Sequence, residues 1–329
     1  MDVIWTAEFA NAGWISPFPQ PEATEVTKDV FPSVKRTASF EGKVYGAPFN
    51  SNTQLLWYRK DLVKKAPTTW DQMIKEADQL ASQDKPAFIQ VQANKYEGFT
   101  VWFNALVASA GGQILTGPTT VDLPEGPTED AMKVMGTLAA SPAAAPDIST
   151  SDEDSARIGF ESGTSAFMVN YTFAFASAKA NAPDIAKNMG FAKYPGVVAG
   201  KPSKPPLGGF NIGVGAYSEN KDLAFDAASC IGGDKSELTA TELDGLPPSR
   251  EHLYTNKVVT KAYPGFAQLV KKSIADAGPR PQTPAYQDVS LAIQDTLQPP
   301  DKIDPNDVTP LYDDLKSSLD DAVKGEGLF

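Results

Sequence analysis

The sequence predicts a mixed α/β protein built as two lobes. Its 329 residues are enough for two ordinary domains, and 41% hydrophobic with 21% charged residues is a globular composition. Strand-like runs at 43–59 and 207–217 alternate with segments of helical periodicity, as in an α/β fold. No tandem repeat or low-complexity tract interrupts the pattern.

The charge of the chain excludes some classes of partner. The formal net charge is -12 and the pI is about 4.7, so the excess of Lys and Arg that neutralises phosphates is missing. We therefore expect no nucleic-acid partner and no binding to an anionic membrane surface. No run of residues approaches the length of a membrane-spanning helix.

The sequence offers little for catalysis or metal binding. Cys230 is the only cysteine and is expected to be a small core residue, so neither a disulfide framework nor a thiolate metal site is predicted. His252 is the only histidine and follows a Pro-Pro pair, which makes a His-based nucleophilic mechanism depend on one loop residue. We predict no catalytic residue, no metal ligand and no cofactor.

The first elements are short. Asp2 to Trp5 is expected to form a buried strand, and the residues from Phe31 to Phe40 a short helix that leads to the strand at Lys43.

Residues 43–62 are the stretch around which the chain is organised. Two apolar runs flank the polar residues Asn50, Ser51 and Asn52, and both runs are expected to be buried strands. Side-chain amides between buried strands need partners, which sugar hydroxyls can supply because they donate and accept hydrogen bonds. The alternative is an Asx-turn in a surface loop.

Helices with buried faces follow. Thr69 and Gln72 have the spacing of a capping box, and apolar residues then recur at helical intervals to Ala81. A second helix, 99–110, carries Trp102 on an aromatic face that is typical of packing, so Trp102 is left out of the site. Thr128 is expected to open a third helix.

Residues 151–175 read as a helix capped by Ser151, a strand and an aromatic loop. This order places Tyr171 and Phe173 at the carboxyl end of a strand, where ligands bind in open α/β sheets. Aromatic faces there can stack on a sugar ring. Glu153 lies at the helix start, where a carboxylate is also favoured by the helix dipole alone.

The run 207–217 is expected to be a strand because Phe210, Ile212 and Val214 alternate with small residues. The same alternation argues against a dinucleotide motif, and the paired Gly208 and Gly209 suggest close approach of another backbone. A helix with Leu223, Ala227, Ala228 and Ile231 on its apolar face follows.

The last third of the chain is predicted to be helical over 266–277, 289–297 and 308–323. Between the first and the second of these helices, Arg280 lies between two prolines. Its backbone is therefore stiff, and its guanidinium can present a fixed set of donors. A loop arginine paired with a carboxylate is the alternative.

Five segments resemble one family in the family's own order. They are MDVIWTAEFANAGWI at the start, YGAPFNSNTQLLWYRKDL at 45–62, GFESGTSAFMVNYTFAF at 159–175, LGGFNIGV at 207–214, and DGLPPSRE with GPRPQTPAYQDVS near the end. Together they resemble the family 1 extracellular solute-binding proteins, the sugar receptors of ABC importers. Within that family the match is strongest to the trehalose-binding lipoproteins of actinobacteria.

The resemblance implies a two-lobed, type II periplasmic-binding-protein-like fold whose lobes are joined by crossover strands. It places residues 1–59 and 209–252 in the first lobe, and residues 60–208 and 253–329 in the second. Segments 43–62 and 207–217 would cross between the lobes, with a third crossing strand near Gly245 to Arg250. The ligand would lie in the cleft between the lobes.

The resemblance also gives roles to single residues. Asp2 would point into the cleft, unless it is a cap or a surface carboxylate. Glu153 and Arg280 would hold sugar hydroxyls, and the backbone of Gly208 and Gly209 would touch the sugar beside Phe210. With Asn50, Asn52, Tyr171 and Phe173 these residues make up the predicted site. The family often has a tryptophan where this chain has Tyr171, which would reduce the stacking area.

One departure from the family concerns the start of the chain. Family members begin with a signal peptide, a lipid-attachment cysteine and a βαβ unit of the first lobe, and this sequence opens at Met1 within the following strand. We therefore expect an incomplete first lobe and no export signal in this chain. Weaker binding than in a full-length relative is the corresponding expectation.

The leading hypothesis is a monomeric, non-enzymatic receptor that binds a disaccharide, with trehalose as the first choice, and delivers it to ABC permease subunits with their ATPase. The full-length form would be a lipoprotein outside the cytoplasm. A glycoside hydrolase that uses cleft carboxylates is the main alternative. A truncated scaffold without binding activity is the other.

Overall fold

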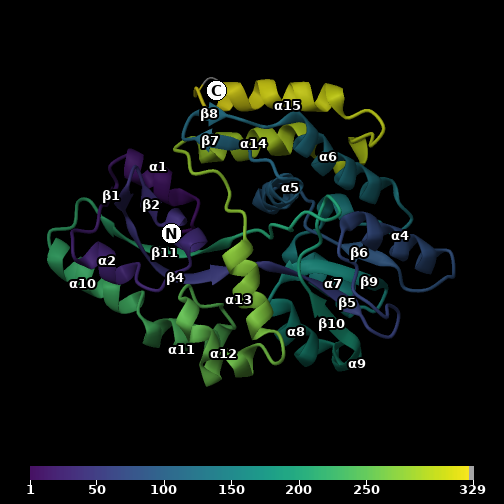
Figure 1. The fold of residues 1–329 in the computed structure, drawn as a ribbon, viewed down its shortest axis with the longest axis horizontal. Coiled ribbons are helices and arrows are strands. Elements are labelled where there is room, and N and C mark those ends of the chain that lie inside the picture. Colours follow the sequence, from purple (N-terminus) through teal and green to yellow (C-terminus); the bar gives the residue numbers. More distant parts are fainter. Residues whose placement is uncertain (326–329) are drawn as a thin grey trace. The chain divides into compact units, whose positions relative to one another are not determined.

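The computed structural model describes residues 1–325 and contains two compact units (Figure 1). Unit 1 consists of Met1–Thr53 and Leu207–Tyr286, and unit 2 consists of Gln54–Pro206 and the chain from Gln287 onward. The chain therefore passes between the units after Thr53, after Pro206 and after Tyr286. The first passage lies within the predicted crossover segment 43–62, and the second lies at the start of the predicted crossover segment 207–217. Residues 253–286, assigned to the second lobe from the sequence, belong to unit 1.

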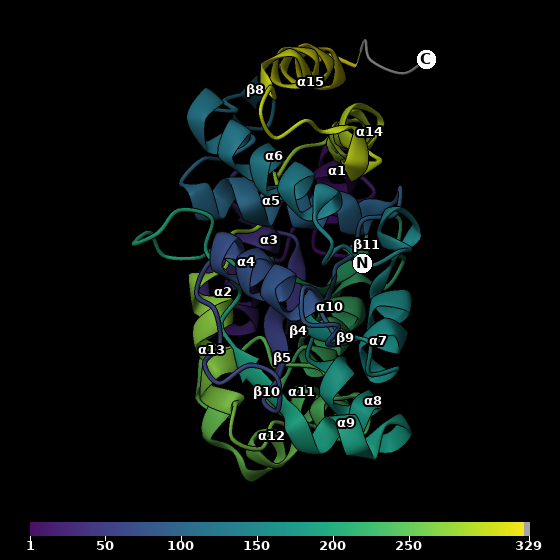
Figure 2. The same cartoon turned by 90° about the vertical axis from the view of Figure 1, so that its right-hand side faces the viewer.

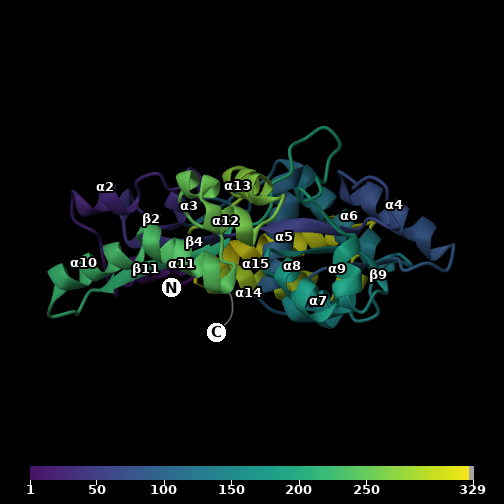
Figure 3. The ribbon, with the colours of Figure 1, turned by 90° about the horizontal axis from the view of Figure 1, so that it is seen from below.

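Unit 1 contains a three-stranded antiparallel sheet in the order β1-β11-β4. The purple helix α2 and the green helix α10 are far apart in sequence but lie side by side (Figures 1 and 3). The elements of this unit are α1 (Trp5–Asn11), β1 (Ile15–Ser16), α2 (Glu22–Val26), α3 (Pro32–Thr37), β2 (Ser39–Phe40), β3 (Lys43–Val44), β4 (Gly46–Asn52), β11 (Gly208–Gly215), α10 (Lys221–Ile231), α11 (Asp234–Asp244), α12 (Lys257–Ala262) and α13 (Ala267–Asp276).

Unit 2 contains a four-stranded mixed sheet in the order β10-β5-β9-β6, in which β6 and β9 are parallel and the other pairs antiparallel. In Figures 1 and 2, α5 and α6 lie between α15 and this sheet. The elements are β5 (Gln54–Arg59), α4 (Trp70–Ala81), β6 (Phe88–Gln90), α5 (Glu97–Ala110), β7 (Leu115–Gly117), β8 (Thr120–Val121), α6 (Glu125–Ala140), α7 (Glu153–Glu161), β9 (Ser165–Tyr171), α8 (Phe173–Asn181), α9 (Pro183–Asn188), β10 (Met189–Ala192), α14 (Tyr286–Leu297) and α15 (Thr309–Ala322).

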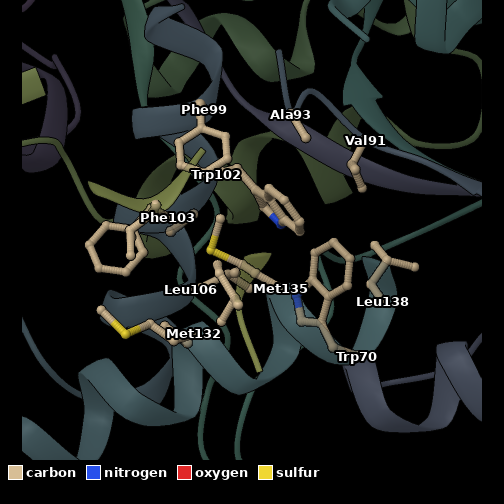
Figure 4. Packing of buried hydrophobic residues seen from close by; sticks show 14 of the residues in the cluster. Trp70, Val91, Ala93, Phe99, Trp102, Phe103, Leu106, Met132, Met135 and Leu138 are labelled. Carbon is tan, nitrogen blue, oxygen red and sulfur yellow. The ribbon is translucent and has the colours of Figure 1, made fainter. Parts of the chain in front are cut away.

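The main core of unit 2 contains the aromatic residues of α4 and α5. Trp70 and Trp102 pack with ring centroids 5.9 Å apart, and Phe99 meets Trp102 edge to face at 6.3 Å (Figure 4). Met132, Met135 and Leu138 of α6 complete this layer. Trp102 is 2% exposed, so its predicted packing role is confirmed.

The helix boundaries follow local sequence signals. The Thr69 hydroxyl accepts a hydrogen bond from the Gln72 amide at 3.2 Å, which confirms the predicted N-cap of α4. Helix α5 ends at Gly111, which adopts the left-handed conformation that glycine allows. Helix α7 is capped by Asp152, whose carboxylate accepts from the Ser155 amide at 2.8 Å, so the predicted cap Ser151 was one residue early.

Two predicted strands are wrong. Asp2 forms only an isolated bridge to Phe210, and the chain turns at once into α1. The segment Gly245 to Arg250 is irregular apart from a single bridge between Arg250 and Val30, because Pro247 and Pro248 have no amide hydrogens to donate to a sheet. This segment lies within unit 1, and the third passage between the units follows Tyr286.

Helix α10 buries only part of the apolar face expected from its sequence, namely Ala228. Phe225 and Ala228 are buried, whereas Leu223 and Ile231 are 68% and 44% exposed. Cys230 lies on the exposed side, so its predicted core position is also wrong. Among residues 1–325, no helix is long and apolar enough to cross a membrane.

Candidate functional site

Strands β4 and β11 of unit 1 bring five of the predicted site residues together. Their register pairs Asn52 with Gly208, Ser51 with Gly209, and Asn50 with Phe210. The polar residues predicted to lie between two strands therefore lie within β4, and the chain leaves the strand only at Thr53.

The two asparagines of β4 have different surroundings. Asn50 is 2% exposed; its side-chain oxygen accepts from the Phe210 amide at 3.1 Å and its amide group donates to the Ser51 carbonyl at 3.2 Å. These bonds lie at a bulge, where the register shifts between Phe210 and Asn211. Asn52 is only partly buried, and its oxygen accepts from the Thr53 amide at 3.1 Å. Asn50 thus holds the strand pair together, while Asn52 is accessible to a ligand.

Gly209 fits the predicted close approach of two backbones. Its φ is +133°, and a Cβ at this position would lie 2.4 Å from the carbonyl oxygen of Asn50. Gly208 is different, since a Cβ there would meet only the Asn52 Cβ at an ordinary 3.5 Å. Glycine is therefore required at the second position of the pair by backbone geometry.

A charged pair and an exposed ring lie at the Phe210 end of β11. Asp2 bridges to Phe210, and its carboxylate is 3.5 Å from Nη2 of Arg280. Arg280 is 7% exposed and its guanidinium lies 5.9 Å from the centre of the Tyr286 ring. Phe210 is 47% exposed. The structure thus joins Asp2, Phe210 and Arg280, which the sequence had placed at distant points of the chain.

Unit 2 brings Glu153 and Tyr171 together through Asn170. The Asn170 amide group donates to the backbone oxygen of Glu153 at 2.9 Å, and its side-chain oxygen accepts from the Tyr171 amide at 2.8 Å. Asn170 is fully buried at the end of β9, and its carbonyl also accepts from the Trp57 indole at 3.0 Å. The start of α7 and the end of β9 are therefore fixed to each other.

The Glu153 carboxylate has a partner that the sequence analysis missed. The Tyr96 hydroxyl donates to it at 2.7 Å. Burial of Tyr96, together with the negative charge of Glu153, raises the pKa of the phenol well above its usual range, so Tyr96 stays a donor. Tyr96 immediately precedes α5 and belongs to no motif, so only the fold brings it to Glu153.

Phe173, the remaining aromatic residue of the predicted site, is partly buried. Phe173 is the first residue of α8, directly after the turn that follows Tyr171. Two residues later, Phe175 stacks on Trp57 with ring centroids 6.1 Å apart and an interplanar angle of 15°. The predicted site residues therefore form two sets, one in each unit. Asp2, Asn50, Asn52, Gly208, Gly209, Phe210 and Arg280 lie in unit 1, and Glu153, Tyr171 and Phe173 lie in unit 2.

The sequence analysis also left out Trp5, which follows Asp2 by one turn. Its amide donates to the Asp2 carbonyl at 3.1 Å, and its indole is 41% exposed. The sequence analysis had placed Trp5 in a buried strand, so it did not predict this exposure.

Known proteins with similar sequences indicate the family of this chain. The sequence model of the bacterial extracellular solute-binding proteins matches residues 1–236. A Deinococcus radiodurans protein named "Probable ABC transporter-binding protein" is 31% identical over 261 residues, which are 75% of this chain and 61% of that protein. The diacetylchitobiose binding protein DasA of Streptomyces coelicolor is 25% identical over 70% of this chain and 55% of its own length. The chain thus spans less than two thirds of these relatives.

Solved structures agree on the fold. The maltose-bound MalE3 of Thermotoga maritima superposes with a TM-score of 0.84 at 23% identity, covering 97% of this chain and 82% of that one. The GacH receptor of Streptomyces glaucescens gives a TM-score of 0.82 at 23% identity, covering 98% and 82%. The fold is therefore that of the type II periplasmic binding proteins. With a family match over most of its length, the chain belongs to the bacterial extracellular solute-binding proteins.

Proposed function

We propose that this chain is the sugar-binding component of an ABC importer and that it binds a disaccharide, trehalose being the ligand to test first. The Asp2–Arg280 pair beside the exposed ring of Phe210 carries the proposal. It combines fixed hydrogen-bonding groups with an uncovered apolar face, which is what a pyranose needs on its edge and on its C–H face.

The second set of residues supports the same ligand class. Glu153 is held by Tyr96 and begins a helix beside Tyr171, so a carboxylate and a phenol ring are offered together. Each set thus offers a carboxylate together with an aromatic side chain from the same unit. Such a site discriminates between epimers because a misplaced hydroxyl strands a buried donor or acceptor.

The proposed mechanism is closure around the ligand followed by delivery to the permease subunits and their ATPase, outside the cytoplasm. The ligand would favour closure by the additional contacts made in that state. The expected lipid anchor and the monomeric state belong to the same proposal. Family membership and the named sugar-binding relatives support sugar as the ligand class.

Isothermal titration tests the proposal. The chain is titrated with trehalose, maltose and sucrose, and Arg280→Ala and Glu153→Gln variants are titrated with the sugar that binds. Saturable binding that weakens in both variants supports sugar binding to which both Arg280 and Glu153 contribute. Binding that neither variant changes would place the site elsewhere, and no binding of any disaccharide would end the proposal.

The same samples separate a receptor from a glycoside hydrolase. After prolonged incubation with the bound disaccharide, the released monosaccharide is measured. A receptor returns the sugar intact, whereas accumulation of glucose in proportion to protein concentration would identify an enzyme.

A further inference from the structure

A cavity in unit 1 lies apart from the candidate sugar residues. Its volume is about 450 Å³, which is within the range of cavities that hold small molecules. Its walls come from α2 and the turns on either side of it, from the last turn of α3, and from the hairpin of β2 and β3. None of the predicted site residues lines it. The lining residues are Gln20, Ala23, Thr24, Thr27, Lys28, Lys35, Ser39, Gly42 and Val44.

The charge of this cavity is opposite to that of the chain as a whole. The lining contains Lys28 and Lys35 and no aspartate or glutamate, although the chain has 41 acidic and only 29 basic residues. Lys35 lies in the last turn of α3, next to the exposed Arg36, which adds to the positive charge on this side of unit 1. A cavity walled by two cations and no carboxylate favours an anionic ligand.

The two lysines of the cavity have no counter-charge within the chain. Among residues 1–325, neither of them takes part in an ion pair. The acidic neighbour of Lys28 does not neutralise it, because the Asp29 carboxylate lies 3.8 Å from Nδ1 of His252. Elsewhere exposed lysines do pair, as Lys75 does with Asp71 at 2.8 Å. The positive charge of the cavity is therefore available to a ligand from outside the chain.

The buried side of the cavity is held in place by hydrogen bonds and offers no aromatic surface. Thr27 is 6% exposed, and its hydroxyl donates to the Ala23 carbonyl at 2.8 Å. The Val44 carbonyl accepts from the Phe18 amide at 2.8 Å, which fixes β3 to the segment before α2. None of the lining residues is aromatic, so the cavity lacks the ring that stacks on a sugar.

The exposed side of the cavity supplies hydrogen-bond donors. The side-chain oxygen of Gln20 accepts from the Thr24 hydroxyl at 2.8 Å, which leaves the amide hydrogens of Gln20 for a ligand. The Ser39 hydroxyl already donates to the Lys35 carbonyl at 3.0 Å. The donors that remain are therefore mainly the two ammonium groups and the Gln20 amide. Ammonium groups bind phosphate as compact charges with rotatable donors.

We propose that this cavity is an anion site that binds a small soluble phosphomonoester through Lys28 and Lys35, separately from the proposed sugar site. The two ammonium groups hold the phosphate, and the organic part of the ester occupies the rest of the cavity against Ala23 and Val44. A soluble ligand is favoured over a phospholipid headgroup, because the net charge of -12 opposes the approach of the chain to an anionic membrane.

Phosphorus NMR titrations test the proposal with inorganic phosphate and phenyl phosphate as probes, at constant ionic strength. Both probes are expected to bind saturably, and phenyl phosphate more tightly because its ring buries apolar area inside the cavity. A double variant, Lys28→Gln with Lys35→Gln, should bind each probe about three- to thirtyfold more weakly, the loss expected from two solvent-exposed charge contacts.

A second double variant is the matched control. Lys221→Gln with Lys257→Gln removes the same charge from exposed positions of unit 1 that do not line the cavity. Its affinity for both probes should change much less than that of the cavity variant. Sugar titrations of both double variants should match the native chain, which shows that they are folded and that the two sites are separate.

Several outcomes would overturn the anion site. Equal losses in the two double variants would mean that only the overall charge attracts the probes. Phenyl phosphate that binds no more tightly than inorganic phosphate would show that the cavity does not hold the organic part of an ester. Co-sedimentation with phosphatidylglycerol vesicles that the cavity variant abolishes would assign the two lysines to a lipid headgroup instead of a soluble ligand.

Discussion

Glu237 and Arg250 form a buried ion pair in unit 1, with Nε of the arginine 3.2 Å from the carboxylate. The carboxylate also accepts from the amide and the hydroxyl of Ser249, each at 2.7 Å, while Arg250 donates to the carbonyl of Lys28 at 2.6 Å. The pair ties α11 to the irregular segment that ends at Arg250. That segment in turn supports β4, because the Pro247 carbonyl accepts from the Ser51 amide at 2.8 Å.

The first prediction concerns the pH dependence of stability. Burial raises the pKa of Glu237 from 4.5 to about 7, although Ser249 and Arg250 act to lower it. The folded chain therefore retains a proton between these values that the unfolded chain releases, so this group's contribution to stability is lost as the pH rises from 4.5 to 7. The free energy of unfolding should fall by up to about 3 kcal/mol over this window because of Glu237.

Denaturant unfolding at a series of pH values, for the native chain and for Glu237→Gln, measures this contribution. The variant cannot titrate, so the difference between the two free energies of unfolding should change over this window. A difference that is constant with pH would show that Glu237 is ionised in the folded chain throughout.

The second prediction concerns Arg280. Arg280→Ala should weaken sugar binding by about 1.5 to 3 kcal/mol, the range for hydrogen bonds to a charged group, while the chain stays folded. Arg36→Ala, an exposed arginine of the same unit, serves as the control. Titration with the sugar that binds measures both affinities, and equal affinities of Arg280→Ala and the control would show that Arg280 does not contact the sugar.

Much of the fold could be predicted from the sequence where one segment carries its own signal. Periodicity predicted α4 and α5, and alternation predicted β11, because these patterns report which side of an element is buried. The prediction of a strand at Asp2 was wrong because a short apolar run is compatible with a strand and also with a turn into a helix. The predicted buried face of α10 was only partly correct because apolar residues lie on both sides of this helix. Packing against the rest of unit 1 buries Phe225 and leaves Leu223 exposed.

The site was predictable only in part for a related reason. Side chains that lie beside a glycine pair or at a strand end could be found by position, as with Phe210 and Tyr171. Partners from distant segments could not, because no local pattern connects Tyr96 with Glu153 or Asp2 with Arg280. The separate structural role of Asn50 and the accessible position of Asn52 also depend on the register with β11, which the sequence does not specify.

The third prediction concerns the Tyr96 hydroxyl. Tyr96→Phe removes the donor that orients the Glu153 carboxylate and should weaken sugar binding by about 0.5 to 1.5 kcal/mol, the net value of one hydrogen bond. Tyr194→Phe is a matched control, because the buried Tyr194 hydroxyl has no hydrogen-bond partner within residues 1–325. Titration of both variants should show a loss only for Tyr96→Phe. Equal affinities would mean that Glu153 needs no orientation from Tyr96.

The last prediction concerns the glycine pair. Gly209→Ala should lower the free energy of unfolding by about 1 to 3 kcal/mol, because its φ of +133° disfavours any side chain and the new Cβ would lie 2.4 Å from a backbone oxygen. Gly208→Ala meets only a Cβ at 3.5 Å, so its stability should change by no more than about 0.5 kcal/mol.

Thermal and denaturant unfolding of the two alanine variants check this difference, and sugar titration adds a second comparison. If the backbone of Gly208 touches the ligand, Gly208→Ala should lose affinity while it keeps its stability. Gly209→Ala should lose both, because the backbone would have to shift where Gly209 pairs with Ser51, beside the bond between Asn50 and Phe210. Equal stability of the two variants would contradict the close approach at Gly209. Unchanged affinity of Gly208→Ala would remove Gly208 from the proposed site and leave the strand pair with a purely structural role at that position.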